Sequence, residues 1–353
     1  MKKRILLVFI GLALSYCCGR LLLYVFEKNA DSIIYEGIFP GGNLYSPGKK
    51  LTEVYAALDT ETKSEMESET EINIPMTEAV AELETVTESE KYALAVTNSV
   101  YTIDELTNFS FAKENFYVIS SNTELTEEML DLDKLVTTDL RLAKDESNPQ
   151  ILIFHTHGQE KFADSDKNNK SIVDVGEYLA KQLKEKYGYN VLHITESFDY
   201  VNGKLDRSMA YTYANQRLEE ILEENPTIEV VIDLHRDGVG ENTHLVTEIN
   251  EKKTAQIMLF NGISYTKAQG DLKDHFNPYR LENLAMTYQM NLLAEESYPD
   301  FVRCIYVDAY RYCLHHRARS LLIEAGAQTN TYEEVCNAME PLADLINMEL
   351  SVH

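Results

Sequence analysis

Short apolar runs and amphipathic stretches alternate along the sequence after Pro149, and this alternation restricts the fold more than any other feature. The apolar runs are residues 151–154, 190–194, 228–234, 256–260, 302–307 and 320–323. The stretches with helical periodicity are residues 172–183, 209–224, 281–298 and 332–350. Nearly continuous apolar strands are buried on both faces, which is typical of a parallel sheet covered by helices. We therefore predict an α/β domain with a mainly parallel twisted sheet and helices on both faces, in which Pro341 kinks or interrupts the last helix.

The first 28 residues follow another pattern. Three basic residues at positions 2–4 precede a stretch from Ile5 to Phe26 that is apolar apart from its glycines, Ser15 and Arg20. At 1.5 Å per residue, this stretch spans roughly 33 Å, about the thickness of a bilayer core. The basic residues favour a cytoplasmic N-terminus, so we predict a single-pass signal-anchor with the bulk of the chain outside the cytoplasm. A cleaved signal peptide and a buried core helix are the alternatives.

Residues 29–91 have the composition of a linker. Their acidic part, "LTEVYAALDTETKSEMESETEINIPMTEAVAELETVTESEK", is dense in Glu, Thr and Ser and poor in aromatic residues. Such a segment buries too little apolar surface to offset the entropy of ordering, so we predict an acidic disordered linker. An acidic docking segment for a basic partner is the alternative. Aromatic residues return in 92–149, a small N-terminal region of the outer part, and residues 150–353 form the main domain.

The overall charge restricts the class of partner. The chain has 58 Asp and Glu residues against 32 Lys and Arg residues, which gives a formal net charge of −26. The resulting field repels polyanions, which argues against nucleic acid as a partner. The five cysteines include no C-x-x-C pair, so the sequence suggests neither a disulfide framework nor a thiolate zinc site.

Chemically reactive side chains follow three of the apolar runs. They occur in "ILIFHTHGQE", "VVIDLHRDG" and "SLLIEAGAQTNT". In open α/β sheets, ligands bind outside the carboxyl ends of the strands. We therefore expect the side chains at these three ends to form one site. The residues concerned are His155, His157, Glu160, Asp233, His235, Arg236, Asp237 and Glu324.

An H-x-x-E spacing joins His157 to Glu160, and it allows two side chains of a tight turn to converge on one metal ion. His235, from a neighbouring strand end, is the third predicted ligand. Two imidazoles and one carboxylate leave a zinc position open for water, as in catalytic zinc sites. Glu324 is then the general base for that water, whose pKa zinc lowers. The pattern predicts a Zn²⁺-dependent hydrolase.

Two ligand positions have alternatives. His155 competes with His157, because residues i and i+2 of an extended chain face the same side and both can reach the site. Asp174, at the start of the following helix, competes with Glu160 as the carboxylate ligand. The short H-x-x-E spacing favours Glu160.

Charged residues flank His235 on both sides in the sequence. Asp233 and Asp237 are candidates to hydrogen-bond the ring nitrogen of His235 that faces away from the metal and so to orient the ring. Arg236 is a further candidate for a position beside the metal.

Structural roles remain open for the same residues. A histidine at a strand end is often only hydrogen-bonded, and Glu160 can simply begin a polar loop. Glu324 alternatively pairs with Arg317 or Arg319. Three strand ends that carry His, His and Glu together favour the metal site over these separate interpretations.

With these residues in place, the chain resembles the stage II sporulation protein P family of endospore-forming Firmicutes. The resemblance runs from about Tyr101 to Leu350, through "PQILIFHTHGQEKF", "VVIDLHRDG", "LLIEAGAQTNT" and "NAMEPLADLI" in this order. The signal-anchor, linker and outer domain also match the family's layout. The stretch "YRYCLHHRARS" departs from the Ser-, Gly- and Pro-rich turn usual in the family, which leaves substrate detail near Glu324 open.

The resemblance implies a zinc-dependent cell-wall hydrolase with a fold similar to that of zinc amidases. Such proteins act as N-acetylmuramoyl-L-alanine amidases, which remove stem peptides from the glycan strands of peptidoglycan, and as endopeptidases on crosslinks, during engulfment in sporulation. The resemblance also implies stage II sporulation proteins D and M as partners, and a membrane location between mother cell and forespore.

Carried over to this chain, the resemblance implies ligands at His157 and His235 and the acid at Glu324. For the middle carboxylate, zinc amidases favour Asp174 and H-x-x-E carboxypeptidases favour Glu160. The alternatives are a zinc peptidase that acts on crosslinks only and a non-catalytic peptidoglycan-binding scaffold. Retention of both histidines and of Glu324 argues against the scaffold.

Overall fold

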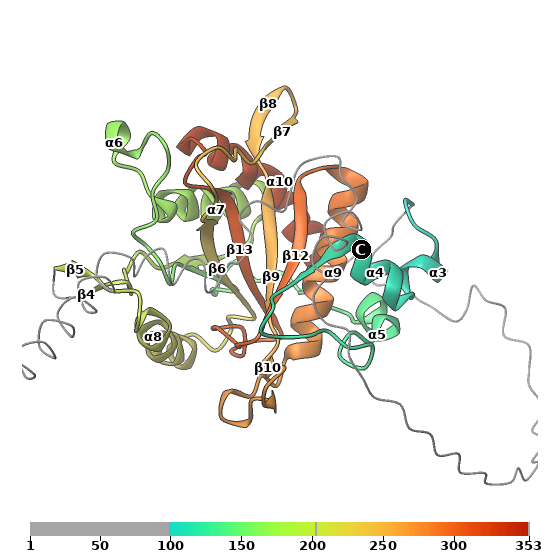
Figure 1. Cartoon of the computed structure of the whole chain (residues 1–353). Coiled ribbons are helices and arrows are strands. Elements are labelled where there is room, and N and C mark those ends of the chain that lie inside the picture. Colours follow the sequence, from blue (N-terminus) through green and yellow to red (C-terminus); the bar gives the residue numbers. More distant parts are fainter. Residues whose placement is uncertain (1–98, 202, 352–353) are drawn as a thin grey trace, which may run out of the picture. The chain divides into compact units, whose positions relative to one another are not determined.

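A seven-stranded sheet forms the centre of the molecule (Figure 1). The structure is a computed structural model, and it describes residues 99–201 and 203–351. The described residues belong to one unit. The predicted signal-anchor at 1–28 and linker at 29–91 lie outside them. Within the described ranges, no helix has the length and apolar character needed to cross a membrane.

The strands of the sheet lie in the order β1-β12-β9-β13-β6-β2-β3. Their bounds are β1 (Tyr117–Ile119), β2 (Ile151–Phe154), β3 (Val191–His193), β6 (Val230–Asp237), β9 (Ile257–Gly262), β12 (Val302–Asp308) and β13 (Arg319–Ala327). Neighbouring strands are parallel except for β13 and β9, which are antiparallel. The predicted mainly parallel sheet is confirmed, and each predicted apolar run contributes a strand to it.

Helices flank the sheet on both faces, as predicted (Figure 1). Their bounds are α3 (Ile103–Leu106), α4 (Phe109–Phe116), α5 (Leu132–Thr137), α6 (Ser165–Asn168), α7 (Ile172–Tyr187), α8 (Ala210–Glu224), α9 (Arg280–Ser297) and α10 (Tyr332–Leu350), with a 3₁₀ turn, η2 (Lys273–His275). Three small hairpins complete the fold: β4 (Tyr200–Val201) with β5 (Lys204–Leu205), β7 (Val246–Ile249) with β8 (Lys252–Ala255), and β10 (Tyr265–Thr266) with β11 (Gly270–Asp271).

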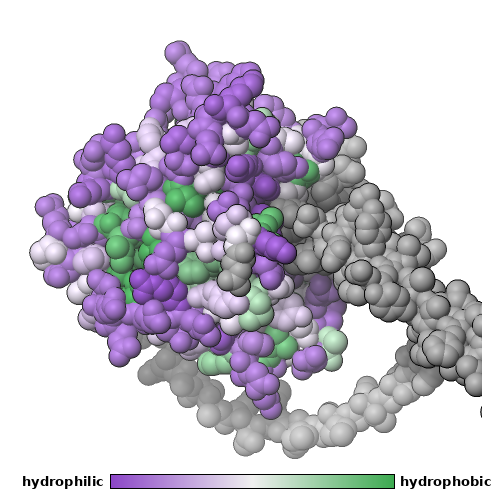
Figure 2. All heavy atoms as spheres, turned by 90° about the vertical axis from the view of Figure 1, so that its left-hand side faces the viewer, coloured by the Kyte–Doolittle hydropathy of each residue, from purple (hydrophilic) through white to green (hydrophobic). Residues whose placement is uncertain are grey.

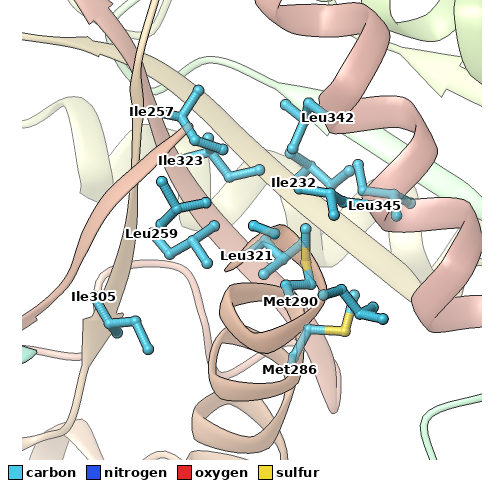
Figure 3. Packing of buried hydrophobic residues seen from close by; sticks show 14 of the residues in the cluster. Ile232, Ile257, Leu259, Met286, Met290, Ile305, Leu321, Ile323, Leu342 and Leu345 are labelled. Carbon is cyan, nitrogen blue, oxygen red and sulfur yellow. The ribbon is translucent and has the colours of Figure 1, made fainter. Parts of the chain in front are cut away.

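The last helix, α10, continues through Pro341, so the predicted interruption does not occur. A proline inside a helix removes one backbone hydrogen bond and crowds the preceding turn. Here Pro341 is buried, and its neighbours Leu342 and Leu345 pack in the core with Ile232 of the sheet (Figure 3). Tertiary packing therefore outweighs the local preference.

The two faces of the sheet are covered differently. Alternate residues of a strand point to opposite faces. Ile153, Ile232 and Ile323 belong to the large core that α7, α9 and α10 cover (Figure 3). Leu152 and Val231 point the other way and belong to a smaller core with α8. We call these the three-helix face and the α8 face.

Residues 99–149 are part of the same fold. They supply the edge strand β1, which pairs with β12, and the helix α5. Gln289 of α9 donates hydrogen bonds to the carbonyl oxygens of Leu135 and Thr138, at 2.6 and 2.9 Å. This region is therefore an extension of the main domain and shares its core.

Candidate active site

The predicted reactive residues meet at the ends of β2, β6 and β13. His235 of β6 lies opposite Glu324 of β13 in the parallel register, and Phe154 of β2 lies opposite Asp233. Val231 points to the α8 face, so Asp233 and His235 do so as well. Glu324 follows Ile323, a residue of the three-helix face, and therefore also points to the α8 face. The site lies on this side of the sheet.

A turn at residues 156–159 carries His157 to the same side. The ring centroid of His157 lies 5.3 Å from that of His235 and 5.6 Å from that of Tyr211 in α8. The Nδ1 atom of His157 is buried and has no hydrogen-bond partner among the described residues. Burial, assisted by the neighbouring His235, lowers the pKa of His157 to about 4. The ring is therefore neutral at physiological pH, which is the form that binds metals.

Glu160 is buried in contact with His235. Its Oε2 atom accepts a hydrogen bond from the backbone N–H of Arg236 at 2.9 Å and lies 3.7 Å from Nδ1 of His235. Its Oε1 atom lies 3.8 Å from a guanidinium nitrogen of Arg207. Burial opposes ionisation, but the contacts with His235 outweigh it and lower the pKa of Glu160 to about 2. Glu160 is therefore a carboxylate.

His235 lies between two carboxylates. Its Nε2 atom is 2.7 Å from Oδ1 of Asp233, within the distance of an ion pair. Asp233 is held by the backbone N–H and the hydroxyl of Thr156, at 2.9 and 2.6 Å. Burial disfavours the imidazolium, but Asp233 and Glu160 outweigh burial and raise the pKa of His235 well above its ordinary value. A metal ion between these groups would displace that proton, because a ligating imidazole is neutral.

Glu324 is buried, and its Oε2 atom lacks a hydrogen-bond partner within the part of the chain that the structure describes. Burial raises the pKa of Glu324 to about 8, and repulsion from Asp237 and Glu160 contributes. The structural alternative for Glu324 does not hold, because the two arginines proposed for it bind elsewhere. Arg317 donates to the carbonyl of Ile228, and Arg319 pairs with Glu229.

His155 lies on the three-helix face, away from these groups. Its Nδ1 is 2.7 Å from the carbonyl oxygen of Leu234, and its Nε2 is 2.9 Å from Nε2 of His193. The ring packs on Gly176 of α7, where an added Cβ atom would lie 2.4 Å from it. The expectation that His155 and His157 share one face is wrong, because the chain leaves the extended conformation at Thr156 and turns.

Asp174 also lies outside the site. It forms the capping box of α7 with Ser171 and pairs with Lys170 at 2.7 Å. Of the two candidate carboxylates, the structure brings Glu160, and not Asp174, next to the histidines.

The other two charged neighbours of His235 have separate contacts. Asp237 forms a buried ion pair with Arg303 of β12 at 2.7 Å. The backbone of Arg236 holds Glu160, and its guanidinium donates to the carbonyl oxygens of Lys161 and Asp237. Of the two aspartates proposed to orient His235, only Asp233 contacts it.

Sequence reasoning missed two residues beside the site, Asp199 and Arg207. Asp199 is fully buried, and its Oδ2 atom lies 3.9 Å from Nδ1 of His157. Both follow β3, which also ends at this edge of the sheet. The signal was present in the sequence: the apolar run at 190–194 also ends at this edge of the sheet, where ligands bind, and the segment with Asp199 and Arg207 follows it.

The chemistry of the donor set fits a zinc ion. Within the described ranges, no three His, Cys, Asp or Glu side chains are arranged as a ready metal site. Two donors bound to one tetrahedral zinc at about 2.0–2.2 Å lie roughly 3.4 Å apart. The 3.7 Å between Glu160 and Nδ1 of His235 is close to that separation. The neutral, buried ring of His157 lies beside them, with its centroid 5.3 Å from that of His235.

Comparison with known proteins identifies relatives. The sequence matches the model of the family "Stage II sporulation protein P (SpoIIP)" over residues 47–347. No curated protein matches the chain.

Solved structures of amidases align with somewhat more than half of the chain at low similarity. The catalytic domain of CwlV, an N-acetylmuramoyl-L-alanine amidase from Bacillus (Paenibacillus) polymyxa var. colistinus, shares 13% identity, with a TM-score of 0.33, over 56% of this chain and 96% of that chain. The amidase AmiC2 of Nostoc punctiforme shares 14% identity, with a TM-score of 0.35, over 59% and 97%. An N-acetylmuramoyl-L-alanine amidase from Clostridium difficile 630 shares 16% identity, with a TM-score of 0.33, over 57% and 94%. Identities and TM-scores this low do not justify assigning the activity of these amidases to this chain.

Proposed function

Because the chain belongs to the stage II sporulation protein P family, we propose that it is a zinc-dependent peptidoglycan hydrolase. Its reaction is hydrolysis of the amide bond between N-acetylmuramic acid and the stem peptide, with cleavage of peptide crosslinks as an additional activity. The observation that carries the proposal is the convergence of His157, Glu160, His235 and Glu324 from three strand ends on the α8 face.

His157, Glu160 and His235 would hold the zinc ion. They supply two imidazoles and one carboxylate, the donor set of catalytic sites that keep a position open for water. Zinc in such a site lowers the pKa of water and polarises a carbonyl oxygen. The backbone N–H of Arg236 fixes the orientation of Glu160, and Asp233 lies beside the outer nitrogen of His235. These contacts restrain two of the three donors before any metal binds.

Glu324 is the general base in this proposal. It arrives on its own strand, opposite His235, and no described cation pairs with its free oxygen. Burial raises its pKa to about 8, which makes its carboxylate a stronger base than that of an ordinary glutamate and allows the carboxyl group to return the proton to the leaving amine. Arg303 neutralises Asp237 next to it, which limits the repulsion that the carboxylate of Glu324 experiences.

Substrate would approach from the side of α8 and the β4–β5 hairpin. Among the residues of the site, the His157 side chain retains 16% exposure, whereas His235 retains 3%. Figure 2 looks at this side of the molecule and shows apolar side chains among hydrophilic ones. Tyr200 and Leu205 of the hairpin and Tyr213 of α8 are exposed apolar residues of this region. They would supply contact area for a long polymeric substrate.

We also propose that residues 1–28 anchor the protein in the membrane and that the hydrolase domain works outside the cytoplasm, between mother cell and forespore, during engulfment. Sporulation proteins D and M are the proposed partners. The support is the apolar N-terminal stretch and the family. Protease added to intact protoplasts should degrade residues beyond the anchor, and full protection would contradict this topology.

The direct test is digestion of purified sacculi by the purified protein, with mass spectrometry of the released material. We expect stem peptides to be released, the release to stop with a zinc chelator, and added zinc to restore it. His235→Ala should lose both zinc and activity. His244→Ala, an exposed histidine paired with Glu334, is the matched control and should keep both.

The alternatives give different products in the same assay. Release of crosslink fragments without stem peptides would indicate a zinc peptidase that acts on crosslinks only. Binding to sacculi without any product, in a protein shown to contain zinc, would indicate a scaffold.

A further inference from the structure

The segment between β3 and α8 contains the β4–β5 hairpin, and its base touches the site. Tyr200 pairs with Leu205, and the backbone N–H of Asp206 donates to the carbonyl of Asp199 at 2.8 Å. This bond closes the base of the hairpin. Asp199, which accepts this bond, and Arg207, which follows its donor, are therefore held close together next to the turn that carries His157.

Asp199 is a buried carboxylate that faces His157. Its Oδ1 atom accepts a hydrogen bond from the hydroxyl of Ser197 at 2.9 Å. Its Oδ2 atom is without a hydrogen bond in the described part of the chain, and so is Nδ1 of His157, 3.9 Å away. A buried carboxylate oxygen and a buried imidazole nitrogen that face each other are a matched acceptor and donor. A shift of about 1 Å would bring them to hydrogen-bond distance.

The local backbone brings the two residues together. Gly158 packs against Ser197, and a Cβ atom at Gly158 would lie 3.3 Å from the Ser197 hydroxyl. The side chain of Gln159 donates to the same hydroxyl at 3.1 Å. The turn after β2 and the segment before the hairpin are thus in direct contact, which fixes Asp199 beside His157.

Arg207 lies between two buried carboxylates. Its guanidinium nitrogens are 3.8 Å from Oε1 of Glu160 and 3.9 Å from Oδ2 of Asp199. Two carboxylates buried near each other repel and require a cation or hydrogen bonds. Arg207 supplies that charge to both at once. Arg207 therefore connects Asp199, the carboxylate beside the proposed ligand His157, to Glu160, which is itself a proposed ligand.

We propose that Asp199 and Arg207 are positioning residues of the metal site. Asp199 accepts a hydrogen bond from Nδ1–H of His157, which fixes the tautomer whose other nitrogen, Nε2, has its lone pair free for the metal. Arg207 holds the carboxylates of Asp199 and Glu160 in place. Asp233 lies beside His235 in the same way, so each imidazole has its own buried carboxylate. The inference rests on the proposed function, because it concerns the same metal site.

The test is the zinc affinity of the full-length protein in detergent, measured by competition with a chromogenic chelator. Asp199→Asn should weaken zinc binding by roughly 10- to 100-fold, the effect typical of an outer partner of a ligand. The absorption bands of the Co²⁺-bound protein should also shift, because they report the ligand geometry. Asp206→Asn is the matched control. Its exposed carboxylate binds only Ser208 within the described residues, so zinc affinity should not change.

A second variant tests the cation independently of Asp199. Arg207→Gln should weaken zinc binding, and Arg207→Lys should restore part of the loss because it keeps the charge. If Asp199→Asn does not fold, which circular dichroism would show, this pair still decides the question. Equal zinc affinity of Arg207→Gln and the wild type would overturn the role of Arg207.

The remaining outcomes separate this inference from the proposed function. A wild-type protein that binds no zinc would contradict the proposed function itself. A wild type that binds zinc together with an Asp199→Asn variant of equal affinity would overturn only the positioning role. Complete loss of zinc in Asp199→Asn, as expected for His235→Ala, would also overturn it, because Asp199 would then be a ligand.

Discussion

His155 and His157 are two residues apart at the end of one strand, yet their surroundings are opposite. His155 lies on the three-helix face, and both of its ring nitrogens have partners, Leu234 and His193. His157 lies on the α8 face with a buried Nδ1 that has no hydrogen-bond partner in residues 99–201 and 203–351. Burial lowers the pKa of both rings, so both are neutral.

Under the proposed function, this difference separates a structural histidine from a metal ligand. Buried polar atoms in folded proteins are almost always paired, so an unpaired one requires an explanation. On the α8 face, His157, Asp199 and Glu324 all have such atoms within the described residues, and they surround the same small region. The hydrogen bonds of His155 are complete within the fold, whereas the incomplete ones around His157 agree with the proposed metal site.

The largest effect should come from Glu324→Gln. The variant keeps the shape of the side chain and removes its ability to accept a proton, so stem-peptide release should fall by about 100- to 10,000-fold. Zinc content and folding should not change, because Glu324 is not a proposed ligand. Release is measured from sacculi by mass spectrometry, and bound zinc by elemental analysis.

Glu349 provides the matched control for Glu324. It is a second buried glutamate whose pKa burial raises, but it lies in α10 on the three-helix face. Glu349→Gln should leave turnover unchanged. Near wild-type release by Glu324→Gln would mean that another carboxylate, such as Glu160 or Asp237, is the base.

The second effect concerns the choice between Glu160 and Asp174. Glu160→Gln removes a proposed ligand, so zinc affinity should fall by more than the roughly 10- to 100-fold expected for an outer partner. Asp174→Asn weakens only the cap of α7 and should leave zinc affinity unchanged. The measurement is chelator competition on both variants. The reverse result would move the metal toward the start of α7.

The sequence was sufficient to predict the strands of the main sheet and the helices that cover it. The apolar runs and the helical periodicities correspond to strands and helices because burial on both faces of a sheet leaves a direct record in composition. The antiparallel contact between β13 and β9 was not predicted, since apolar runs carry no information on strand direction. The hairpins were missed for a related reason: their short strands, such as β4 and β5, lie outside the core and show no apolar run.

The site was predictable in part. The residues at the ends of β2, β6 and β13 could be selected because reactive side chains directly follow buried strands. The separation of His155 from His157 depends on one turn that begins at Thr156, and a shift of a single residue there would reverse it. The strand-end rule points to the segment after residues 190–194, but Asp199 and Arg207 are brought together by the closure of a hairpin, which no local pattern records.

The third prediction is that replacing the two histidines has opposite effects on stability and on zinc binding. His155→Ala leaves the carbonyl of Leu234 and the ring of His193 without their partner, which should cost about 1–3 kcal/mol of unfolding free energy. Its zinc affinity should stay unchanged. His157→Ala should lose zinc, with a smaller loss of stability in the metal-free protein. Urea unfolding and chelator competition measure the two properties. Loss of zinc in His155→Ala at unchanged stability would reverse the assignment of the two histidines.

The smallest effect tests Glu349 itself. Burial raises the pKa of Glu349 well above its ordinary value, and neither carboxyl oxygen has a hydrogen-bond partner in the described structure. The folded protein therefore keeps this proton over a pH range in which the unfolded chain has lost it. The contribution of Glu349 to stability is therefore most favourable below its ordinary pKa of about 4.3, and it declines as the pH rises toward the folded-state value.

Glu349→Gln removes this pH-dependent loss. The variant should match the wild type at pH 4 and be more stable at pH 8, where a gain of about 1 kcal/mol would raise Tm by roughly 2–4 °C. Thermal unfolding at the two pH values measures the difference, with Glu333→Gln, an exposed position in the same helix, as the control. An equal shift at both pH values would mean that the amide improves packing and that the charge of Glu349 is not the cause.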